Sequence, residues 1–399
     1  MTPAPVVITG LGAVSGLGAG VVDLWLHALA ARSAIGPMQL FATGSHRTSI
    51  AAQVPDGLPL CGDLAWSRAE RFGCTAADEA VAGLPIAARH SNRAGVFFGS
   101  STGALLESEQ FLSELLQHRE GRLAPMAAQQ NDGPGTAVAR HLGVRGPVVT
   151  FSTACTSANV ALAAALDALR SGEVDVAVAG GADELCETTY AGFNSLRAID
   201  PQPTQPFRRA RAGLSMGEGS GVLLLETLDH AHARGATILC ELLGAGRSCD
   251  AYHVSAPEPD GRGAAAAIRM ALLEAGLQPA DVTFVNAHGT GTPHNDQAES
   301  KAMHDVFGER ATRLPLTSTK SLVGHLLGAA GGIEAVLTAL SIVHRLLPPT
   351  AGDEPADPEL GLDVVLHEPR RLPVHNVGLS TNLAFGGNNA VVLLQSHRR

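Results

Sequence analysis

The stretch VVTFSTACTSA at residues 148–158 determines how the rest of the chain is organised. Its apolar, β-branched first half is typical of a strand, and it leads into residues 160–169, a run of strong helix formers with a single charge. A helix with so little charge is expected to be buried on nearly every side. We therefore predict a strand, a short turn that carries Cys155, and a buried helix.

Cys155 is the candidate reactive group of this stretch. At the N-terminus of a helix, the partial positive charge of the helix dipole favours the thiolate over the thiol, and the thiolate is the nucleophile. The alternative is a buried structural cysteine, which is the more common role of an isolated Cys. Two histidines later in the chain, His288 and His325, favour a reactive thiol.

The composition is that of a globular chain. Its 399 residues are 45% hydrophobic and 17% charged, which is enough for two core-forming halves. The net charge of -10 argues against a nucleic-acid binder. The six cysteines are scattered without a CxxC pair, so neither a disulfide framework nor a zinc site is expected. Without a run of eighteen apolar residues or the features of a signal peptide, a cytoplasmic location is the working assumption.

Strands alternate with helices along the chain, which is typical of a layered α/β domain. The second half repeats the order of elements of the first, and the apolar helix expected over 324–343 corresponds to the helix after Cys155. Two similar halves, residues 1–235 and 236–399, are the simplest account. Because both helices are apolar on nearly every side, we expect them to pack together between two sheets.

Four polar residues of the second half are candidates for the site. His288 follows a predicted strand, and His325 begins the helix predicted over 324–343. A single histidine of this kind is more often structural, but two at equivalent element ends, each beside glycines, indicate a site. Lys320 and Glu334 flank His325 in apolar sequence, and an isolated buried charge costs roughly several kcal/mol, so we expect them to pair. A structural ion pair and a direct catalytic role both remain open.

Three motifs resemble the active-site motifs of the elongating β-ketoacyl-(acyl carrier protein) synthases. They are TACTS at 153–157, NAHGTGT at 286–292 and STKSLVGH at 318–325. The similarity extends over nearly the whole chain and includes MGEGSG at 216–221 and the glycine turn after Phe385. It implies the thiolase fold, with five layers in the order αβαβα, two duplicated halves and a dimer formed through the N-terminal half. It also implies that no metal or redox cofactor is needed.

The resemblance implies a role for each motif. Cys155 would accept an acyl group from the phosphopantetheine thiol of an acyl carrier protein. His288 and His325, as neutral Nε2–H donors, would stabilise the enolate formed when the malonyl group loses carbon dioxide. The backbone N–H groups of Cys155 and Phe385 would form the oxyanion hole. Thr290 and Thr292 would hydrogen bond the pantetheine arm.

Further roles follow from the same resemblance. Lys320 with Glu334 would order the histidine region, and Phe385 would gate entry. The acyl pocket would be lined by Phe193, Thr102 and Phe385. Because carrier proteins are acidic, arginines should gather at the mouth of the site. The candidates for docking are Arg197, which best matches a family docking position, and Arg68, Arg71, Arg208 and Arg209.

Other members of the superfamily fit less well. A thiolase needs a second catalytic cysteine near the C-terminus, and no cysteine follows Cys249. Initiating synthases use a Cys-His-Asn set, whereas this chain has the STK motif and His325. The non-catalytic chain-length partner of aromatic and polyene synthases is a different class of protein, and it lacks the nucleophilic cysteine.

Several positions depart from the fatty-acid pattern. They are HND at 294–296, AFGGNN at 384–389, ARA at 210–212, and Thr102 in place of a larger apolar residue. These departures resemble the synthases of type II polyketide pathways, including polyene producers, with housekeeping fatty-acid elongation as the alternative. The sequence leaves open whether the subunit pairs with itself or with a chain-length partner.

Overall fold

A computed structural model describes residues 4–44, 46–62, 66–121 and 129–397. The N-terminal half contributes strands in the order β6-β5-β7-β8-β1, and the C-terminal half contributes β11-β10-β15-β16-β9 with β13 at its outer edge. The bounds in the first half are β1 Val6–Ser15, β5 Ala94–Gly99, β6 Val148–Phe151, β7 Val176–Asp183 and β8 Gly219–Thr227. Those in the second half are β9 Cys240–Cys249, β10 Phe284–Asn286, β11 Pro315–Thr317, β13 Asp363–Val364, β15 Val377–Leu383 and β16 Asn388–Gln395.

The two sets of strands are duplicates of one another. In the first set β5 is parallel to β6 and β7, while β8 runs antiparallel to both β7 and β1. In the second set β10 is parallel to β11 and β15, while β16 runs antiparallel to both β15 and β9. The sets meet where β1 pairs antiparallel with β9 through residues 6–8 and 240–242. The order of elements that is repeated in the sequence therefore corresponds to a repeated strand topology.

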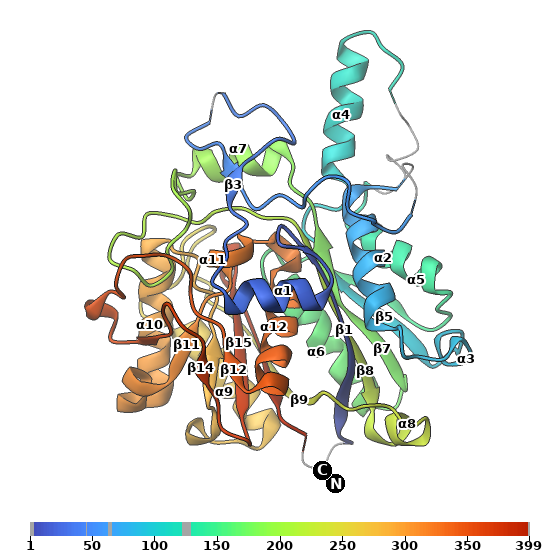
Figure 1. Ribbon diagram of the computed structural model, residues 1–399, viewed down its shortest axis with the longest axis vertical. Helices are drawn as coiled ribbons and strands as arrows, with labels where there is room; N and C mark the ends of the chain where they lie inside the picture. Colours follow the sequence, from blue (N-terminus) through green and yellow to red (C-terminus); the bar gives the residue numbers. More distant parts are fainter. Residues whose placement is uncertain (1–3, 45, 63–65, 122–128, 398–399) are drawn as a thin grey trace.

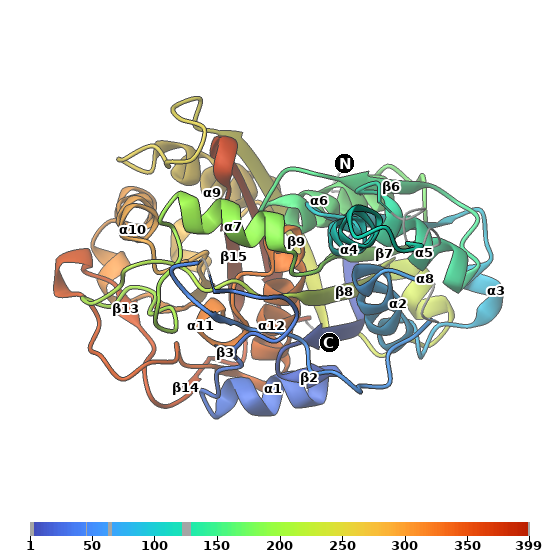
Figure 2. The same ribbon diagram turned by 90° about the horizontal axis from the view of Figure 1, so that it is seen from above.

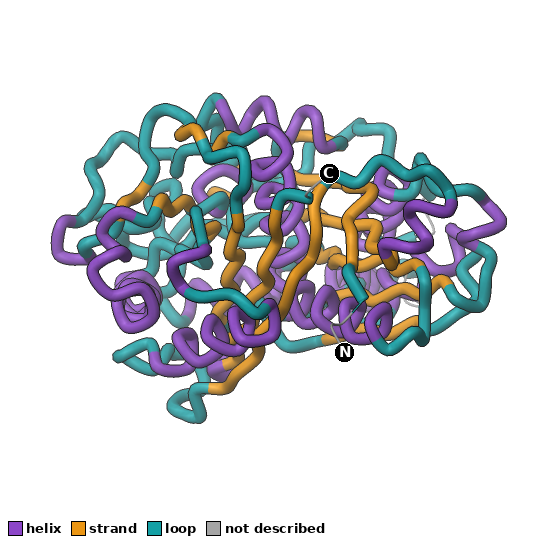
Figure 3. The backbone as a smooth tube through the Cα atoms, turned by 90° about the horizontal axis from the view of Figure 1, so that it is seen from below, coloured by secondary structure: helices purple, strands orange, loops and turns teal. Residues whose placement is uncertain are grey.

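Helices cover the strands in layers (Figure 1). Two central helices, α6 (Ser157–Arg170) and α12 (Ala330–His344), contact strands of both sets as well as each other. Outside the first set lie α2 (Arg68–Ala80) and α5 (Gly133–Leu142), and outside the second lie α9 (Arg262–Ala275) and α10 (Pro293–Phe307). This is the αβαβα order that the family resemblance implies. Seen from below, the strands pass through the middle of the molecule with helices on both sides (Figure 3).

The remaining helices and strands lie outside the main layers or are short. Helix α4 (Leu105–Leu116) projects from the body, and α7 (Glu187–Ser195) lies across the top (Figures 1 and 2). The remaining helices are α1 Val21–Leu29, α3 Ile86–Arg89, α8 Leu228–Ala233 and α11 Lys320–Val323. The short strands are β2 Gly18–Ala19, β3 Gly36–Pro37, β4 Ile50–Ala51, β12 Leu346–Leu347 and β14 Arg370–Arg371.

The helix expected over 324–343 is shorter and begins later than predicted. Helix α11 ends at Val323, Gly324 takes a left-handed φ of 71°, and a 3-10 turn over Leu327–Ala329 precedes α12. His325 therefore lies in a non-helical segment, and its backbone pairs with Ser215 and Gly217. The hydrophobic pattern continued through this segment because it is buried, although it is not helical.

The central helices form the main core. Within the described ranges, one helical stretch, Leu327–His344, is long and apolar enough to cross a membrane, and 89% of it is buried inside the protein. Leucine, alanine and valine side chains of α6 and α12 belong to one hydrophobic cluster that also includes residues of β1 and β8. The apolar composition of α12 is thus accounted for by its place between the two sets of strands.

We predict that Gly221→Ala strongly destabilises the protein. A Cβ atom on Gly221 in β8 would lie 2.2 Å from the backbone nitrogen of Ile333 in α12, and neither backbone can move without displacing a central layer. Overpacking of this kind should lower the free energy of unfolding by about 3 kcal/mol or more, measured by urea denaturation. Gly83→Ala is the matched control, because nothing lies within 4 Å of its added Cβ, and it should change stability by less than about 0.5 kcal/mol. Equal stability of the two variants would contradict the tight packing of α12 on β8.

Candidate active site

The thiol of Cys155 is held in a tight turn between β6 and α6. Ala154 adopts a left-handed φ of 53°, a strained conformation for a residue with a Cβ atom. Ser157 fixes the turn, because its Oγ accepts from the N–H of Thr153 at 2.9 Å and donates to the carbonyl of Ala154 at 2.6 Å. The side chain of Cys155 is buried, with 7% of the residue exposed. The turn predicted around this cysteine is present, and it directs the sulfur into a cavity.

The cavity has a volume of about 400 Å³ and is formed by both halves of the chain. Cys155 and Phe193 come from the first half, whereas His288, His325 and Phe385 come from the second. Thr290, Thr292, Arg197, Asp250 and Asn389 also line it. The rings of Phe193 and Phe385 stack with their centroids 5.3 Å apart. The duplicated topology is what brings these residues, distant in sequence, to one place.

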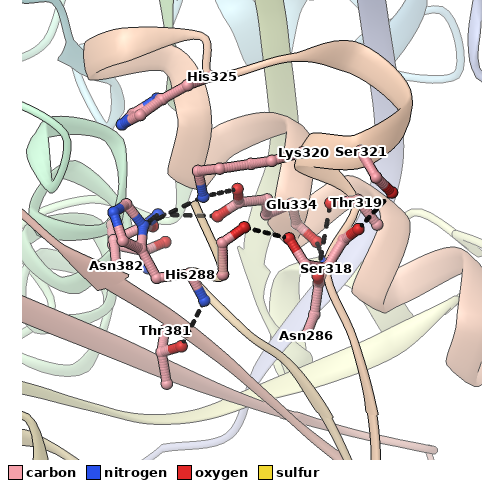
Figure 4. A network of polar contacts seen from close by, with 12 residues as sticks. Asn286, His288, Ser318, Thr319, Lys320, Ser321, His325, Glu334, Thr381 and Asn382 are labelled. Atoms are coloured by element: carbon pink, nitrogen blue, oxygen red, sulfur yellow. Dashed lines mark hydrogen bonds and ion pairs between the residues drawn. The ribbon is translucent and has the colours of Figure 1, made fainter. Parts of the chain in front are cut away.

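Both histidines have a defined tautomer. Nδ1 of His288 accepts from Nζ of Lys320 at 3.1 Å and lies 3.3 Å from the amide nitrogen of Asn382 (Figure 4). Nδ1 of His325 accepts from the backbone N–H of Leu327 at 3.1 Å. Since each Nδ1 is an acceptor, each neutral ring carries its proton on Nε2. The two rings lie at 86° to one another with their centroids 5.4 Å apart.

Burial and the nearby lysine keep these rings uncharged. Desolvation lowers the pKa of His288 well below its usual value, and the charge of Lys320 lowers it further. Desolvation also lowers the pKa of His325, and Lys320 again adds to the effect. At neutral pH the site therefore presents two neutral N–H donors, not two cations.

Lys320 and Glu334 form the ion pair expected from the sequence. Both side chains are 1% exposed, and Nζ of Lys320 contacts both Oε1 of Glu334 and the ring of His288 (Figure 4). Oε2 of Glu334 accepts from Asn382 at 2.8 Å. The pair, the amide and the imidazole therefore make one network, in which each partner fixes the position of the next.

Two buried carboxylates that sequence reasoning missed hold the backbone around this network. Glu299 accepts from the N–H groups of His288 and Gly289, both at 2.8 Å, and from the hydroxyl of Thr381 at 2.7 Å. Asp183 accepts from the hydroxyl of Ser100 at 2.7 Å and from the N–H of Gly328 at 2.6 Å. Glu299 lies in the polar run NDQAESK at 295–301, and Asp183 is followed directly by Glu184, so neither acid stands out in the sequence.

The thiol of Cys155 is less acidic than expected. Burial raises the pKa of Cys155 to about 11, outweighing the opposing effects of the Lys320 charge and of the hydrogen bonds from the backbone N–H groups of Phe385 and Cys155 itself. The helix terminus is expected to favour the thiolate, but burial has the larger effect on the pKa of this thiol. The resting group is a thiol, and its proton must leave during the reaction.

Several of the expected binding residues lie elsewhere. Thr102 does not line the cavity, because its hydroxyl donates to Asp183 at 2.9 Å. Arg68 cannot dock a partner freely, since it is paired with the buried Glu218 and its side chain is 14% exposed. Arg208 is wholly buried and donates to the carbonyls of Thr350 and Gly352, both at 2.9 Å. The charge of Arg68 is thus balanced inside the fold by Glu218, whereas Nε and Nη1 of Arg208 have no hydrogen-bond partner among the described residues.

The other arginines differ in position. Arg197 lines the cavity, in the left-handed conformation with a φ of 55°. Arg71 lies on α2 in the outer layer, where its Nε donates to the carbonyl of Cys61 at 3.4 Å. Arg209 is exposed and lies near Asp357, outside the cavity lining. Of the five arginines, Arg197 is the one at the site itself.

A duplicated five-layered fold with one thiol and two neutral imidazoles in a shared cavity defines an acyltransferase of the thiolase superfamily. Residues 4–231 match the family described as "Beta-ketoacyl synthase, N-terminal domain", and residues 239–353 match "Beta-ketoacyl synthase, C-terminal domain". The chain belongs to the β-ketoacyl synthase family.

Individual relatives agree with this assignment. The 3-oxoacyl-[acyl-carrier-protein] synthase 2 of Synechocystis is 37% identical over 98% of each chain. The solved structure of "the ishigamide ketosynthase/chain length factor" covers 99% of this chain and 100% of its own, with 35% identity and a TM-score of 0.94. A second solved structure is that of a type II PKS acyl-carrier protein in complex with its ketosynthase bound to the hexaketide. One chain of it matches 99% of this chain over 100% of its own length, with 29% identity and a TM-score of 0.91.

We predict that alkylation of Cys155 responds oppositely to the two members of the ion pair. Since Lys320 lowers and Glu334 raises the pKa of the thiol, Lys320→Met should slow alkylation several-fold and Glu334→Gln should accelerate it. In the unchanged protein the rate should rise about tenfold per pH unit from neutral pH upward, because the thiol titrates near 11. Rates are measured by mass spectrometry of the peptide containing Cys155.

Cys249 provides the internal control, because it is exposed and its alkylation should respond to neither substitution. A merely structural disturbance would move both variants in the same direction at Cys155. A rate that levels off near neutral pH would contradict the raised pKa.

Proposed function

We propose that this protein is a β-ketoacyl-ACP synthase that condenses malonyl-ACP with an acyl group held on Cys155, with loss of carbon dioxide. The observation that carries the proposal is the meeting of one thiol and two neutral Nε2–H donors in a single cavity. A thiol can hold an acyl group, and paired neutral donors can stabilise an enolate oxygen. The thiol and the two donors perform different steps of one condensation, so their presence in one cavity favours that reaction.

In the first half-reaction, the sulfur of Cys155 attacks the thioester carbonyl of the acyl carrier protein. The oxyanion that forms accepts hydrogen bonds from the backbone N–H groups of Cys155 and Phe385. Both N–H groups lower the pKa of the sulfur in the resting site, which supports this role. The bond to the pantetheine sulfur then breaks, and that sulfur takes up the proton that Cys155 loses.

In the second half-reaction, malonyl-ACP occupies the same cavity. Its C–C bond to the carboxylate breaks, carbon dioxide leaves, and the electron pair forms an enolate whose oxygen accepts from Nε2–H of His288 and His325. The enolate carbon attacks the acyl carbonyl on Cys155 and forms the new C–C bond. The sulfur of Cys155 leaves as a thiolate and takes up a proton from water.

The neighbouring residues position these groups. Lys320, Glu334 and Asn382 fix the ring of His288, and the amide of Leu327 fixes that of His325. The hydroxyls of Thr290 and Thr292, 2.9 Å apart on the cavity wall, would hydrogen bond the pantetheine arm. Phe193 and Phe385 would contact the acyl chain, and Phe385 would gate its entry. Arg197 would attract the acidic carrier protein at the mouth.

We favour a type II polyketide pathway. The departures at 294–296, 210–212 and 384–389 support it, and His294, Asn295, Phe385 and Asn389 line the cavity. Housekeeping fatty-acid elongation is the second candidate, because the curated relative from Synechocystis is a 3-oxoacyl-[acyl-carrier-protein] synthase 2. We assign the two halves to residues 1–235 and 236–399. We also place the enzyme in the cytoplasm, because the helix that is long and apolar enough to cross a membrane is buried in the core.

We further propose that β6 forms the edge of a subunit interface in the N-terminal half. β6 is the outermost strand of its set, and Val148 and Val149 are 43% and 38% exposed. Leu112, Leu115 and Leu116 on the projecting α4 are also exposed. An unpaired apolar edge is a template for strand pairing, so the partner would be a second ketosynthase-fold chain, either a copy or a chain-length partner.

Intact-mass analysis of carrier-bound products tests the activity. With acyl-ACP and malonyl-ACP, the expected product is longer than the primer by one ketide unit. Cys155→Ala should abolish both the acyl-enzyme and the product. His325→Asn should still form the acyl-enzyme but should reduce condensation at least about 100-fold, because it removes a donor to the enolate.

His232→Asn is the matched control, because this exposed histidine of α8 lies far from the cavity, and its activity should be unchanged. Hydrolysis of the acyl group without C–C bond formation would contradict the proposed condensation. Absence of an acyl-enzyme would instead support a non-catalytic partner subunit.

The interface is tested by sedimentation equilibrium. We expect a dimer of the purified chain, or of the chain with its chain-length partner, and Val149→Lys should weaken it at least about tenfold by placing a charge on the apolar edge. Leu273→Lys on α9, an exposed leucine of the opposite half, is the control. A dimer insensitive to Val149→Lys would rule out the β6 edge.

A further inference from the structure

Three metal-ligating side chains meet on the outer layer of the first half, away from the cavity. Cys61 precedes α2, Asp78 lies on α2 and His141 lies in the last turn of α5; these two helices are neighbours in Figure 1. Sγ of Cys61 lies 3.4 Å from Nε2 of His141, and both carboxylate oxygens of Asp78 lie 2.8 Å from the same nitrogen. One ligand atom from each residue lies within 4.8 Å of the other two.

The geometry does not suit a nucleophilic triad. In such a triad the sulfur contacts one ring nitrogen of the histidine and the carboxylate contacts the other, so that the proton can pass through the ring. Here the sulfur lies closer to Nε2 than to Nδ1, which is 3.7 Å away, and the carboxylate also faces Nε2. Sulfur, nitrogen and oxygen thus converge on one point in space.

Convergence of this kind is the geometry of a metal centre. Zn²⁺ binds Cys, His and Asp at about 2.0–2.3 Å, and tetrahedral angles then place neighbouring ligand atoms roughly 3.3–3.6 Å apart. The observed sulfur to nitrogen distance of 3.4 Å already lies in this range. The half-exposed carboxylate of Asp78 would have to move outward by only about half an ångström. We propose that Cys61, Asp78 and His141 form a site for Zn²⁺, with water as the fourth ligand.

The surrounding contacts hold the ligands in place before an ion arrives. The N–H of Cys61 donates to Oγ1 of Thr75 at 2.8 Å, and that hydroxyl donates to the carbonyl of Arg71 at 2.7 Å. The ring of His141 meets that of Trp66 edge-on, with the centroids 6.0 Å apart. The loop ligand is thus fastened to α2, and the helix ligand is supported by an aromatic ring.

An ion can reach the site from solvent and would cross-link the elements that carry its ligands. The side chains of His141 and Asp78 are 26% and 47% exposed, so the open coordination position faces solvent. None of the three residues lines the cavity that holds Cys155. The ion would therefore tie the loop before α2 to both outer helices and contribute stability, and condensation would not need it. This inference does not rest on the proposed function.

Titration of the untagged, chelator-treated protein with Co²⁺ tests the site, with Zn²⁺ as competitor. We expect one equivalent of Co²⁺ to give thiolate-to-cobalt charge-transfer absorption and the ligand-field bands of a tetrahedral ion, both lost on adding Zn²⁺. Cys61→Ser should abolish the charge-transfer band. Asp78→Asn and His141→Gln should weaken Co²⁺ binding at least about tenfold, a loss typical even of a residue that only supports a ligand. Zn²⁺ should raise the melting temperature of the unchanged protein but not of Cys61→Ser.

Cys249→Ser and His232→Asn are the controls, since these exposed residues belong to no such cluster among the residues that the structure describes. Both variants should bind Co²⁺ like the unchanged protein. A cooperative thermal transition of metal-free Cys61→Ser, close to that of the metal-free unchanged protein, shows that the variant is folded. The proposal is overturned if Cys61→Ser keeps the charge-transfer band, if Cys249→Ser loses it, or if the unchanged protein gives no tetrahedral spectrum with one equivalent of Co²⁺.

Discussion

The buried ion pair between Lys320 and Glu334 is the interaction on which the site depends. Two fully buried charges are costly to desolvate, and such a pair is rarely retained for stability alone. Here the ammonium group has a second contact, to Nδ1 of His288, so the charge that Glu334 balances also determines the ring's tautomer. Burial lowers the pKa of this ring most, and the ammonium charge adds to that effect, so the ring stays neutral. Removal of one member would leave an uncompensated charge beside the histidines. The charge of Lys320 thus determines that Nε2 of His288 donates a hydrogen bond into the cavity.

Buried carboxylates extend the same principle to the backbone. Glu299 and Asp183 are almost completely enclosed, and each is satisfied by several N–H and hydroxyl donors. Asp183 ends β7 in the first half but receives the N–H of Gly328, three residues after His325 in the second half. Ser101, which also donates to Asp183, donates through its hydroxyl to the carbonyl of Ala154 beside Cys155. One carboxylate therefore connects the segment that carries the thiol with the segment that carries an imidazole.

The outer layer contains a polar cluster of a different kind. Cys61, Asp78 and His141 are partly exposed, and their ligand atoms face one another instead of a cavity. Burial dominates the chemistry around Cys155, where it suppresses charge on the thiol and on both rings. At the surface cluster, solvent access is what would let an ion enter. Cysteine and histidine therefore have different chemistry in the two places, because one site is buried and the other is open to solvent.

The sequence alone determined the layered architecture, because the alternation of strands with apolar helices and its repetition leave few other ways to bury two uncharged helices. It also identified Cys155, His288, His325 and the pairing of Lys320 with Glu334, since their motifs are local and the cost of an isolated buried charge is general. Tertiary structure decided the rest. The break before α12, the raised pKa of Cys155, the burial of Arg68 and Arg208, and the meeting of Cys61 with His141 all depend on which groups the fold brings together and how much water it excludes. Residue order carries no direct record of those distances, because each is set by long-range packing between elements far apart in the chain.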